Sequence, residues 1–406
     1  TTEEVAENYK IDENAMDKIL EKNDEELTKR VVEEWSKETL PRFREHPVGA
    51  IPKNRAERKK KNNNEVHKSR TISDFSKQLI DGLAINKTMG EFASIELPQG
   101  DRVHRLIEEA GNWCDRNGLD RTKLRGLKFD VQSAYRIIGI DPADWWAFCY
   151  KLVGKRYFHK RMPFGITSAV YAFLRIPLLI LTFLLTKTNI QSLGAFLAMY
   201  FDDLVVIAPE SKIEEAGRIV RELFKRWNIP IQATKWAEEN PTGLKGAEEI
   251  TILCLEYDLP TFSVGIPAHR CAEILEEIGF ARESSKKWKL KEAESLVGIL
   301  SWAACAIPQL KTFLGSSWNL LRIWNQFERQ RRKLPDKIKN DWSEIARIMS
   351  KFNGKQSILE PVWKIAKAEG YDIKSGTVYP AADASGSIGW GVACEHGFAY
   401  GVWSDD

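Results

Sequence analysis

The sequence lacks the cysteine and histidine patterns that stabilise small secreted domains or bind zinc. Its 406 residues contain six cysteines and six histidines. The cysteines are scattered with no C-x-x-C pair, and the histidines have no H-x-x-x-H spacing. These absences argue against a disulfide framework and a zinc ribbon. We interpret the cysteines as buried thiols of a reducing compartment, the cytoplasm or the nucleus.

The chain also lacks a long hydrophobic run and a signal peptide. The most hydrophobic stretch, IPLLILTFLL at 176–185, lies between Arg175 and Lys187. It is about half the length that spans a bilayer. We therefore expect a buried core helix here, no membrane partner and an intracellular protein. The sequence begins at Thr1 and stops abruptly at Asp406, which suggests a piece of a longer polyprotein.

Charge is nearly balanced over the whole chain but uneven along it. The net charge is +3 and 43% of the residues are hydrophobic, as in a globular chain of more than one domain. Residues 1–40 hold thirteen acids and six bases, and residues 53–70 hold eight Lys and Arg against two Glu. We expect the acidic segment to be a helical linker. The basic run fits either a phosphate-binding surface or a solvated loop.

Hydrophobic periodicity predicts the order of the elements. We expect helices at 101–117, 167–187 and 211–227, strands at 127–131 and 229–234, hairpins around Gly154 and within 250–267, helices from 268 to about 350, and short strands after 376. Between residues 127 and 234 the order is strand, helix, hairpin, helix, strand. That order is typical of a split β-α-β-β-α-β sheet.

One hairpin carries two acids inside an apolar stretch, FLAMYFDDLVVIA at 196–208. Asp202 and Asp203 are adjacent, and two carboxylates about 4 Å apart repel by roughly 4 kcal/mol at an effective dielectric near 20. An isolated Asp-Asp is most often an exposed hairpin tip. The flanks, however, read as strands buried on both faces. We therefore interpret the pair as a turn that places two acids in a cleft, where a cation neutralises them.

A third acid is expected to join them. Asp130 ends the strand GLKFDV, and the split sheet would bring this strand end beside the 202–203 turn. Three hard carboxylate ligands suit Mg²⁺, with Mn²⁺ as a substitute. Two such ions would hold the attacking and leaving oxygens of a phosphoryl transfer.

Four further motifs follow one another along the chain, KFDVQSAYRIIGI, RMPFGITSAVYAF, YFDD and IPIQATK. Their order and approximate spacing resemble those of motifs A, B, C and D of reverse transcriptases. HPVGAIPK and SRTISDFS…GLAIN are similar to two fingers motifs, ILCLEYDLPTFSVGIP to the primer-grip hairpin, and KEAESLVGILSWAACAIPQLKTFL to the helical thumb. The residues of these motifs most resemble those of retrotransposons of the DIRS-like, tyrosine-recombinase type.

The resemblance implies a role for each matching acid and for the residues around the nucleotide. Asp130, Asp202 and Asp203 match the catalytic, metal-binding acids, and the Val131 carbonyl matches a further metal ligand. Tyr135 matches the ring under the sugar of the incoming nucleotide, with Ala134 beside it. A ring there leaves no room for a 2′-hydroxyl, which disfavours an RNA-dependent RNA polymerase.

Further matches concern the triphosphate and the template. Arg70 matches the fingers arginine that grips the triphosphate, with Lys53 assisting, and a guanidinium suits phosphate because it donates in a fixed fork. Lys235 matches the motif D lysine, a candidate proton donor to pyrophosphate. Phe164 and Gly165 match the loop beneath the template–nucleotide pair, although retroviral enzymes have Gln at the position of Phe164.

Two tryptophans and the C-terminal segment complete the site candidates. Trp145 and Trp146 fit either a stacking platform for bases or, as we favour, packing of the fingers on the palm. AADASGSIGWGVA resembles the start of a ribonuclease H-like domain, in which Asp383 matches the first carboxylate. That chemistry needs more acids on a following helix, so we expect no ribonuclease H activity.

The resemblance predicts an α+β right-hand polymerase that extends a primer on an RNA or DNA template with deoxynucleoside triphosphates. Its partners would be RNA template and RNA–DNA hybrid; the sequence indicates no oligomeric state. The alternative is a decayed or domesticated copy that only binds nucleic acid. The expected domains are an acidic segment (1–40), fingers and palm (41–265), helical thumb (266–350), linker (351–375) and an incomplete ribonuclease H-like domain (376–406).

Overall fold

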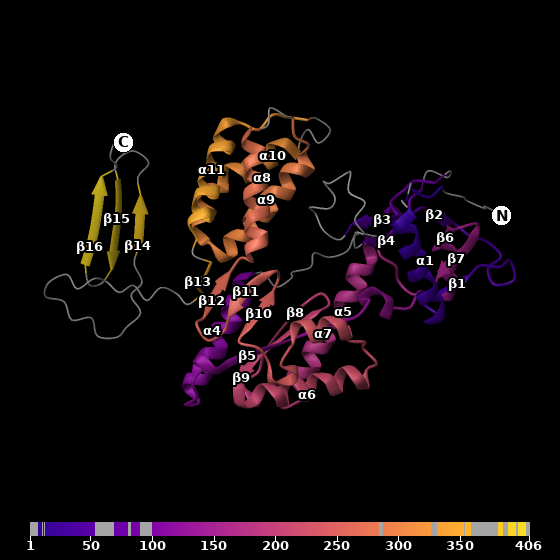
Figure 1. The fold of residues 1–406 in the computed structure, drawn as a ribbon, viewed down its shortest axis with the longest axis horizontal. Coiled ribbons are helices and arrows are strands. Elements are labelled where there is room, and N and C mark those ends of the chain that lie inside the picture. The colour runs from indigo at the N-terminus through magenta and orange to yellow at the C-terminus, as the bar shows by residue number, and fades with distance from the viewer. Residues whose placement is uncertain are drawn as a thin grey trace. The chain divides into compact units, whose positions relative to one another are not determined.

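The fold was analysed in a computed structural model, shown in Figure 1. It describes residues 7–9, 11, 13–52, 69–79, 83–89, 100–283, 287–325, 331–352, 354–358, 381–384, 389–394 and 397–402. The chain divides into two compact units, Thr1–Gln356 and Ser357–Asp406. The division falls inside the linker predicted at 351–375.

A three-stranded antiparallel sheet of the first unit is here called the central sheet. Its order is β5 (Leu124–Asp130), β9 (Asp203–Pro209) and β8 (Phe196–Tyr200). Leu127 and Phe129 of β5 face a core built with α5 (Thr167–Lys187) and α6 (Glu210–Arg226). Alternate strand residues point to opposite faces. Lys128 therefore faces the other side, where it meets Val103 of α4 (Gly100–Arg116).

The free edge of β5 differs from the prediction. Residues 229–234 make a single bridge, Val131 with Ile231, and then enter α7 (Ala233–Glu239), so the predicted fourth strand is wrong. Pro230 has no N–H to donate, although its carbonyl still accepts from Gln132. Further along the edge, the Asn240 amide accepts from the Lys128 N–H and donates to its carbonyl. A side chain thus takes the place of a strand.

A second sheet, the N-terminal sheet, has the order β1 (Val32–Glu34), β7 (Lys155–His159), β6 (Cys149–Leu152) and β2 (Glu45–His46). A separate hairpin is formed by β3 (Val48–Pro52) and β4 (Ser69–Ser73). Helix α1 (Glu13–Thr28) packs on the N-terminal sheet through Ile19. The acidic residues from Glu13 to Glu34 therefore include a helix that packs on this sheet and a strand that joins it.

Short elements connect these parts. They are α3 (Ile85–Thr88), η1 (Arg121–Lys123), η2 (Ala134–Ile137), η3 (Pro142–Ala147), η4 (Ile190–Leu193) and η5 (Gly243–Lys245). Trp145 packs on Phe158, and Trp146 lies 3.8 Å under the Arg42 guanidinium. Both rings thus take part in packing, as favoured above.

The rest of the first unit is a sheet followed by helices. The sheet order is β10 (Glu249–Ile252), β11 (Leu255–Asp258), β12 (Ser263–Gly265) and β13 (Gln356–Ser357). The helices are α8 (Ala268–Glu283), α9 (Leu290–Ala306), η6 (Pro308–Phe313), α10 (Gly315–Asn325) and α11 (Asp336–Lys351). This agrees with the helical region predicted from 268 to about 350.

The second unit is an antiparallel meander of β14 (Ala381–Ala384), β15 (Gly389–Cys394) and β16 (Gly397–Val402). Asp383 lies opposite Gly391 in the register. Short strands were predicted here.

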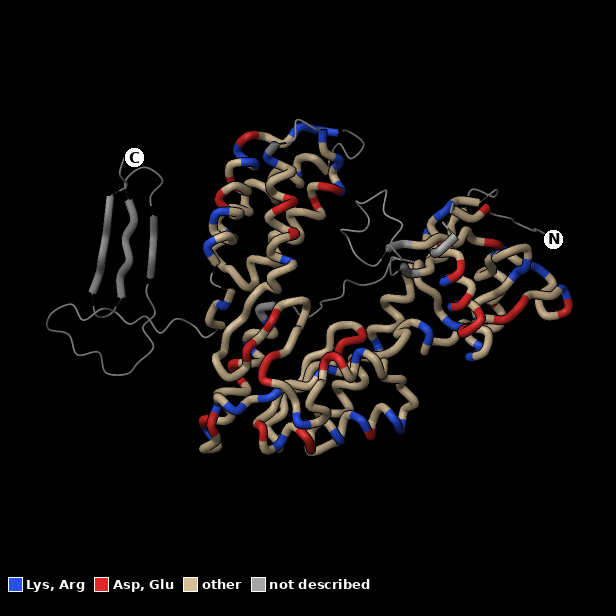
Figure 2. Tube along the Cα trace, in the orientation of Figure 1, with Lys and Arg blue, Asp and Glu red and all other residues tan. Residues whose placement is uncertain are grey.

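Helix α5 is the one helix, among the residues described, that is long and apolar enough to cross a membrane by length and composition. Phe173, Ile180 and Leu184 are buried, whereas Leu178 and Leu179 are exposed. The predicted core helix is therefore buried on one side only. By contrast, Figure 2 shows charges of both signs along α6, which is buried through its apolar residues alone.

Candidate active site

The three predicted acids come together at one end of the central sheet. Asp130 is the last residue of β5 and lies directly opposite Asp203, the first residue of β9. Asp202 precedes it in the turn from β8, and its carbonyl accepts from the Val131 N–H at 2.8 Å. Residues that are far apart in sequence thus meet as the motif order predicted.

The turn that carries Asp202 is tight and strained. Tyr200 pairs with Asp203, so only Phe201 and Asp202 connect the two strands. Phe201 has φ 51°, in the left-handed region that bulky side chains avoid. Such a conformation costs on the order of 1–3 kcal/mol and persists where the surrounding structure enforces it. Here the pairing of β8 with β9 on either side of the turn holds Phe201 in this conformation.

A buried lysine lies beside the acids and was not predicted. Lys128 is two residues before Asp130 and so shares its face of β5. Its Nζ lies 2.8 Å from a Glu239 oxygen and 3.6 Å from an Asp203 oxygen, and its side chain is 11% exposed. Burial lowers its pKa, but Asp203 and Glu239 raise it by more, so the net pKa lies above the usual value. Lys128 is therefore a fixed positive charge.

A second lysine pairs with Asp130. Lys235, in the first turn of α7, forms an ion pair with the Asp130 carboxylate. The Asp130 side chain is 3% exposed and that of Lys235 is 43% exposed. The neighbouring Trp236 packs on Phe129 with ring centroids 4.9 Å apart, which docks α7 on β5. The lysine can consequently turn toward solvent without unpacking its helix.

We call Asp130, Asp202, Asp203 and Glu239, with Lys128 and Lys235, the carboxylate cluster. Its four acids exceed its two lysines. Burial first, and then the charges of Asp202, Asp130 and Glu239, raise the pKa of Asp203 to about 6 against the opposing effect of Lys128. Two buried carboxylate oxygens, Asp203 Oδ1 and Glu239 Oε2, have no hydrogen-bond partner among the described residues. The cluster thus retains negative charge that the protein does not neutralise.

These donors fit a divalent cation in kind. They are hard carboxylate oxygens, which Mg²⁺ prefers, and the unpaired oxygens are polar atoms that a cation would satisfy. In the described part of the chain, no three His, Cys, Asp or Glu side chains are already arranged around a common metal position. Lys235 lies on Asp130 instead, so the exposed lysine has to move for this acid to accept a metal.

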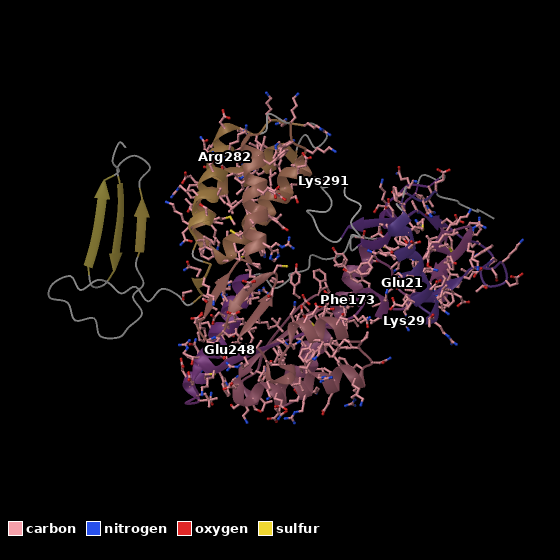
Figure 3. The ribbon with its side chains drawn as sticks, in the orientation of Figure 1. Glu21, Lys29, Phe173, Glu248, Arg282 and Lys291 are labelled. Atoms are coloured by element: carbon pink, nitrogen blue, oxygen red, sulfur yellow. The ribbon has the colours of Figure 1, made fainter. Side chains whose placement is uncertain are left out.

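The residues predicted to contact the nucleotide sugar and the template pair form an aromatic group. Tyr135 lies in η2, and its ring is 5.1 Å from that of Phe164 and 5.7 Å from that of Phe173 on α5, the residue labelled in Figure 3. Ala134 is buried beside it. The structure thus brings the Tyr135 and Phe164 rings into contact, and their roles toward the nucleotide stay predictions.

The loop that holds Phe164 and Gly165 is fixed by a residue outside the predicted set. The Asn86 amide donates to the Gly165 carbonyl at 2.8 Å and accepts from the Thr167 N–H at 3.0 Å. Gly165 has φ 105°, and a Cβ there would lie 2.2 Å from the Ser73 carbonyl oxygen. Only glycine allows this approach of the loop to β4.

The structure says less about the roles of the other predicted residues. Arg70 lies on β4 opposite Ile51, whereas Lys53 and the rest of the basic run up to residue 68 lie outside the described residues. Val131 is buried, and its carbonyl as a metal ligand stays a prediction. Asp383 belongs to the second unit.

Of the residues not predicted, Lys128 left a signal in the sequence. It is a charge between the apolar residues Leu127 and Phe129, two positions from Asp130, and the period of two places Lys128 and Asp130 on one face. Asn86 ends the GLAIN motif quoted above, although the motif did not indicate its contacts. Glu239 and Asn240 left no signal, because their roles come from contacts distant in sequence.

Comparison with known proteins gives a consistent result. Residues 58–257 match the family described as reverse transcriptase (RNA-dependent DNA polymerase). No curated protein matches the sequence at a significant level.

Among solved structures, the foamy viral protease–reverse transcriptase resembles the chain in several complexes. One with double-stranded DNA has a TM-score of 0.58 at 15% identity, covering 100% of this chain and 59% of that one. One with RNA/DNA hybrid has a TM-score of 0.54 at 14% identity, covering 100% and 45%. This chain spans about three fifths of the first of these proteins, and identities this low show similarity of fold. Residues 58–257 thus match a reverse transcriptase domain, and the chain shares the fold of a solved reverse transcriptase.

Proposed function

We propose that the chain is an RNA-directed DNA polymerase that extends a primer with deoxynucleoside triphosphates. The observation that carries the proposal is the register of the central sheet, which sets Asp130 opposite Asp203 with Asp202 in the turn between strands. The foamy viral relatives are described in complex with double-stranded DNA and RNA/DNA hybrid. We accordingly propose RNA template and RNA–DNA hybrid as partners.

In this proposal each region has a part in a right-hand polymerase. The central sheet is the palm, the N-terminal sheet with the β3–β4 hairpin is the fingers, and helices α8–α11 are the thumb. The second unit would be the start of a ribonuclease H-like domain, without its activity. The whole would be part of a retrotransposon polyprotein.

The reaction would join the primer 3′-oxygen to the α-phosphorus of the nucleotide. The 3′-hydroxyl would lose its proton to solvent water, the new P–O bond would form, and the bond to pyrophosphate would break. Two Mg²⁺ ions, or Mn²⁺, bound by Asp130, Asp202, Asp203 and the Val131 carbonyl would neutralise the phosphates and align these oxygens. Asp203 is held in place by Lys128, which keeps part of the cluster's charge balanced throughout.

Lys235 would change partners during the cycle. Before substrate binds, it pairs with Asp130. We propose that it turns to the triphosphate as the nucleotide enters, which frees Asp130, and that it then donates a proton to the departing pyrophosphate. The Asp130 pair raises the pKa of Lys235 against the effect of burial, so the lysine enters the site charged.

Tyr135 and Phe164 would select and seat the nucleotide. The Tyr135 ring, supported by Phe164 and Phe173, would lie under the sugar and exclude a 2′-hydroxyl. Arg70, with Lys53, would bind the triphosphate. The loop at Phe164–Gly165, fixed by Asn86, would lie beneath the template pair.

The test is primer extension on a homopolymer RNA template with Mg²⁺ or Mn²⁺. The wild-type protein should extend the primer, and Asp202→Asn should not, while both bind the hybrid equally. Substantial extension by Asp202→Asn would count against the metal-binding role.

A second function, nucleic-acid binding by an inactive copy, predicts binding without extension by the wild type. Asp130, Asp202, Asp203, Arg70 and Tyr135 are all intact, which favours the polymerase. Binding should also weaken with salt, because phosphate contacts release counterions.

A further inference from the structure

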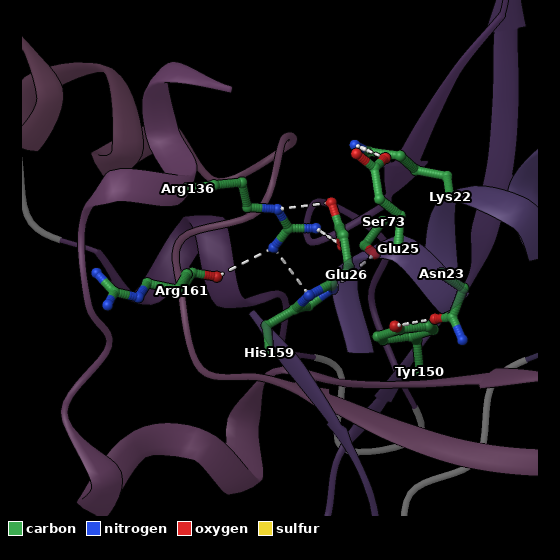
Figure 4. A network of polar contacts seen from close by, with 9 residues as sticks. All are labelled: Lys22, Asn23, Glu25, Glu26, Ser73, Arg136, Tyr150, His159 and Arg161. Carbon is green, nitrogen blue, oxygen red and sulfur yellow. Dashed lines mark hydrogen bonds and ion pairs between the residues drawn. The ribbon is translucent and has the colours of Figure 1, made fainter. Parts of the chain in front are cut away.

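A second buried cluster of charge adjoins the residue proposed to select the sugar. Arg136 follows Tyr135 in η2, and Figure 4 shows its guanidinium between three partners. Nε and Nη2 donate to the two oxygens of Glu26 at 3.1 and 2.6 Å. Nη1 lies 3.0 Å from His159 Nδ1 and 3.1 Å from the Arg161 carbonyl oxygen. The arginine is thus held on all sides.

Glu26 comes from α1, a helix that precedes the residues matched by the family model. The side chains of Glu26 and Arg136 are each 12% exposed. A bidentate pair between a carboxylate and a guanidinium has a defined geometry, and burial protects it from screening by salt. Helix α1 is itself anchored, since the Tyr150 hydroxyl donates to Asn23 at 2.6 Å. The position of α1 therefore constrains η2 through the Glu26–Arg136 pair.

The network continues through His159 to a strand of the nucleotide site. Burial, with the nearby charges of Arg136 and His46, holds the pKa of His159 well below its usual value, so the ring is neutral. Because Nδ1 accepts from Arg136, Nε2 carries the proton and donates to Ser73 Oγ at 3.3 Å.

Ser73 ties the network to the loop under the template pair. It is on β4 with Arg70, and its carbonyl oxygen is where the backbone of Gly165 approaches most closely. A chain of contacts thus runs from α1 to η2, then to β7, β4 and the Phe164–Gly165 loop. These are the elements that carry Tyr135, Arg70 and Phe164.

We propose that Glu26 and Arg136 are positioning residues that set Tyr135 for the choice of deoxyribose over ribose. The proposal rests on the polymerase function above. The substrate class is the deoxynucleoside triphosphate, and the residues act through η2 without touching it. The acidic N-terminal helix is then part of the specificity apparatus.

The test compares Glu26→Gln with Glu25→Gln, its neighbour on the same helix. Glu25 binds Lys22 and Lys29 at the surface, so it receives the same chemical change without touching the network. For Glu26→Gln we expect the KM for deoxynucleotides to rise and discrimination against ribonucleotides to fall, each about tenfold, with kcat little changed. Glu25→Gln should match the wild type.

Arg136→Lys provides a second variant, because it keeps the charge but loses the fork that binds both Glu26 oxygens. It should lower sugar discrimination in the same way. Discrimination equal to wild type in Glu26→Gln and Arg136→Lys overturns the proposal. So does a Glu26→Gln protein that fails to fold, because the pair is then purely structural.

Hydrogen exchange separates this proposal from the function on which it rests. Glu26→Gln should speed amide exchange in residues 134–138 relative to Glu25→Gln, whether or not the protein extends a primer. A wild type that never extends refutes the polymerase function and with it the role in sugar choice, whereas faster exchange in Glu26→Gln would still show that the pair positions η2. Equal exchange in the two variants refutes the positioning role alone.

Discussion

Two buried charge clusters in the first unit differ in how completely they are balanced. In the Glu26–Arg136 pair both carboxylate oxygens and the guanidinium have partners. In the carboxylate cluster four acids share two lysines, and Asp203 Oδ1 and Glu239 Oε2 have no partner among the described residues.

The difference indicates that the Glu26–Arg136 pair maintains the structure around it, whereas the carboxylate cluster is suited to bind a ligand. A satisfied buried pair resists change because removing one member strands the other. An unsatisfied cluster lowers stability until a cation or substrate completes it, which is how functional sites commonly trade stability for activity. The same residue types therefore give opposite responses to mutation.

The largest expected effect comes from Asp203→Asn. Extension should fall about a thousandfold or more, because a proposed metal ligand is lost. The free energy of unfolding at pH 7 without metal should nevertheless rise by about 1–2 kcal/mol, since the raised pKa means that burial disfavours the charged form. Urea unfolding and primer extension measure the two. A variant that is both less stable and fully active would remove the contrast between the clusters.

Lys128→Met should lower the free energy of unfolding by about 3 kcal/mol, because Asp203 and Glu239 keep their buried charges without the lysine. Adding Mg²⁺ should restore part of this loss. The matched control is Lys155→Met, whose ion pair with Glu34 is exposed on both sides, and it should leave the free energy of unfolding nearly unchanged. Equal losses would mean that burial does not distinguish the two lysines.

Tyr135→Val should admit ribonucleotides. Removing the ring opens space for a 2′-hydroxyl, and discrimination should drop about thirtyfold, or about 2 kcal/mol. Single-nucleotide incorporation with each sugar measures the ratio. Phe173→Leu, which removes one ring that supports Tyr135, should give a smaller change of the same sign. Unchanged discrimination in Tyr135→Val would refute the position assigned to the ring.

The smallest effect concerns pH. Since the pKa of Asp203 is raised to about 6, its carboxylate weakens the metal-free fold as pH rises from about 4 to 6. Conversely, protons compete with a metal below pH 6, so Mn²⁺ affinity should fall by at most about tenfold per pH unit there. Calorimetric titration at several pH values measures this. Asp203→Asn should lessen the dependence, and a flat profile in the wild type would argue against Asp203 as a ligand.

The sequence predicted the carboxylate cluster better than the Glu26–Arg136 pair, for a physical reason. Asp130, Asp202 and Asp203 end or join strands that the sequence marks as apolar runs, so strand order alone brings them together. Helix α5 was predicted with its observed bounds, Thr167–Lys187, for the same reason.

The failures share a cause as well. The Glu26–Arg136 pair depends on where α1 packs, and a solvated acidic helix has the same composition as a packed one. The strand predicted at 229–234 stops after the Val131–Ile231 bridge, because the chain enters α7 at Ala233, and the Asn240 side chain at the end of that helix pairs with β5. Contacts between remote side chains leave no periodic trace in a sequence.

Strand β1 has a practical consequence for anyone who trims the chain to the family match at residues 58–257. It pairs with β7 from Val32 to Glu34. A recombinant protein starting at residue 58 would therefore expose the edge of β7, and it would also remove Glu26, the counterion of Arg136. Unprotected rims invite self-association. Poor solubility of such a truncated protein would result from the truncation and would say nothing about the activity of the full chain.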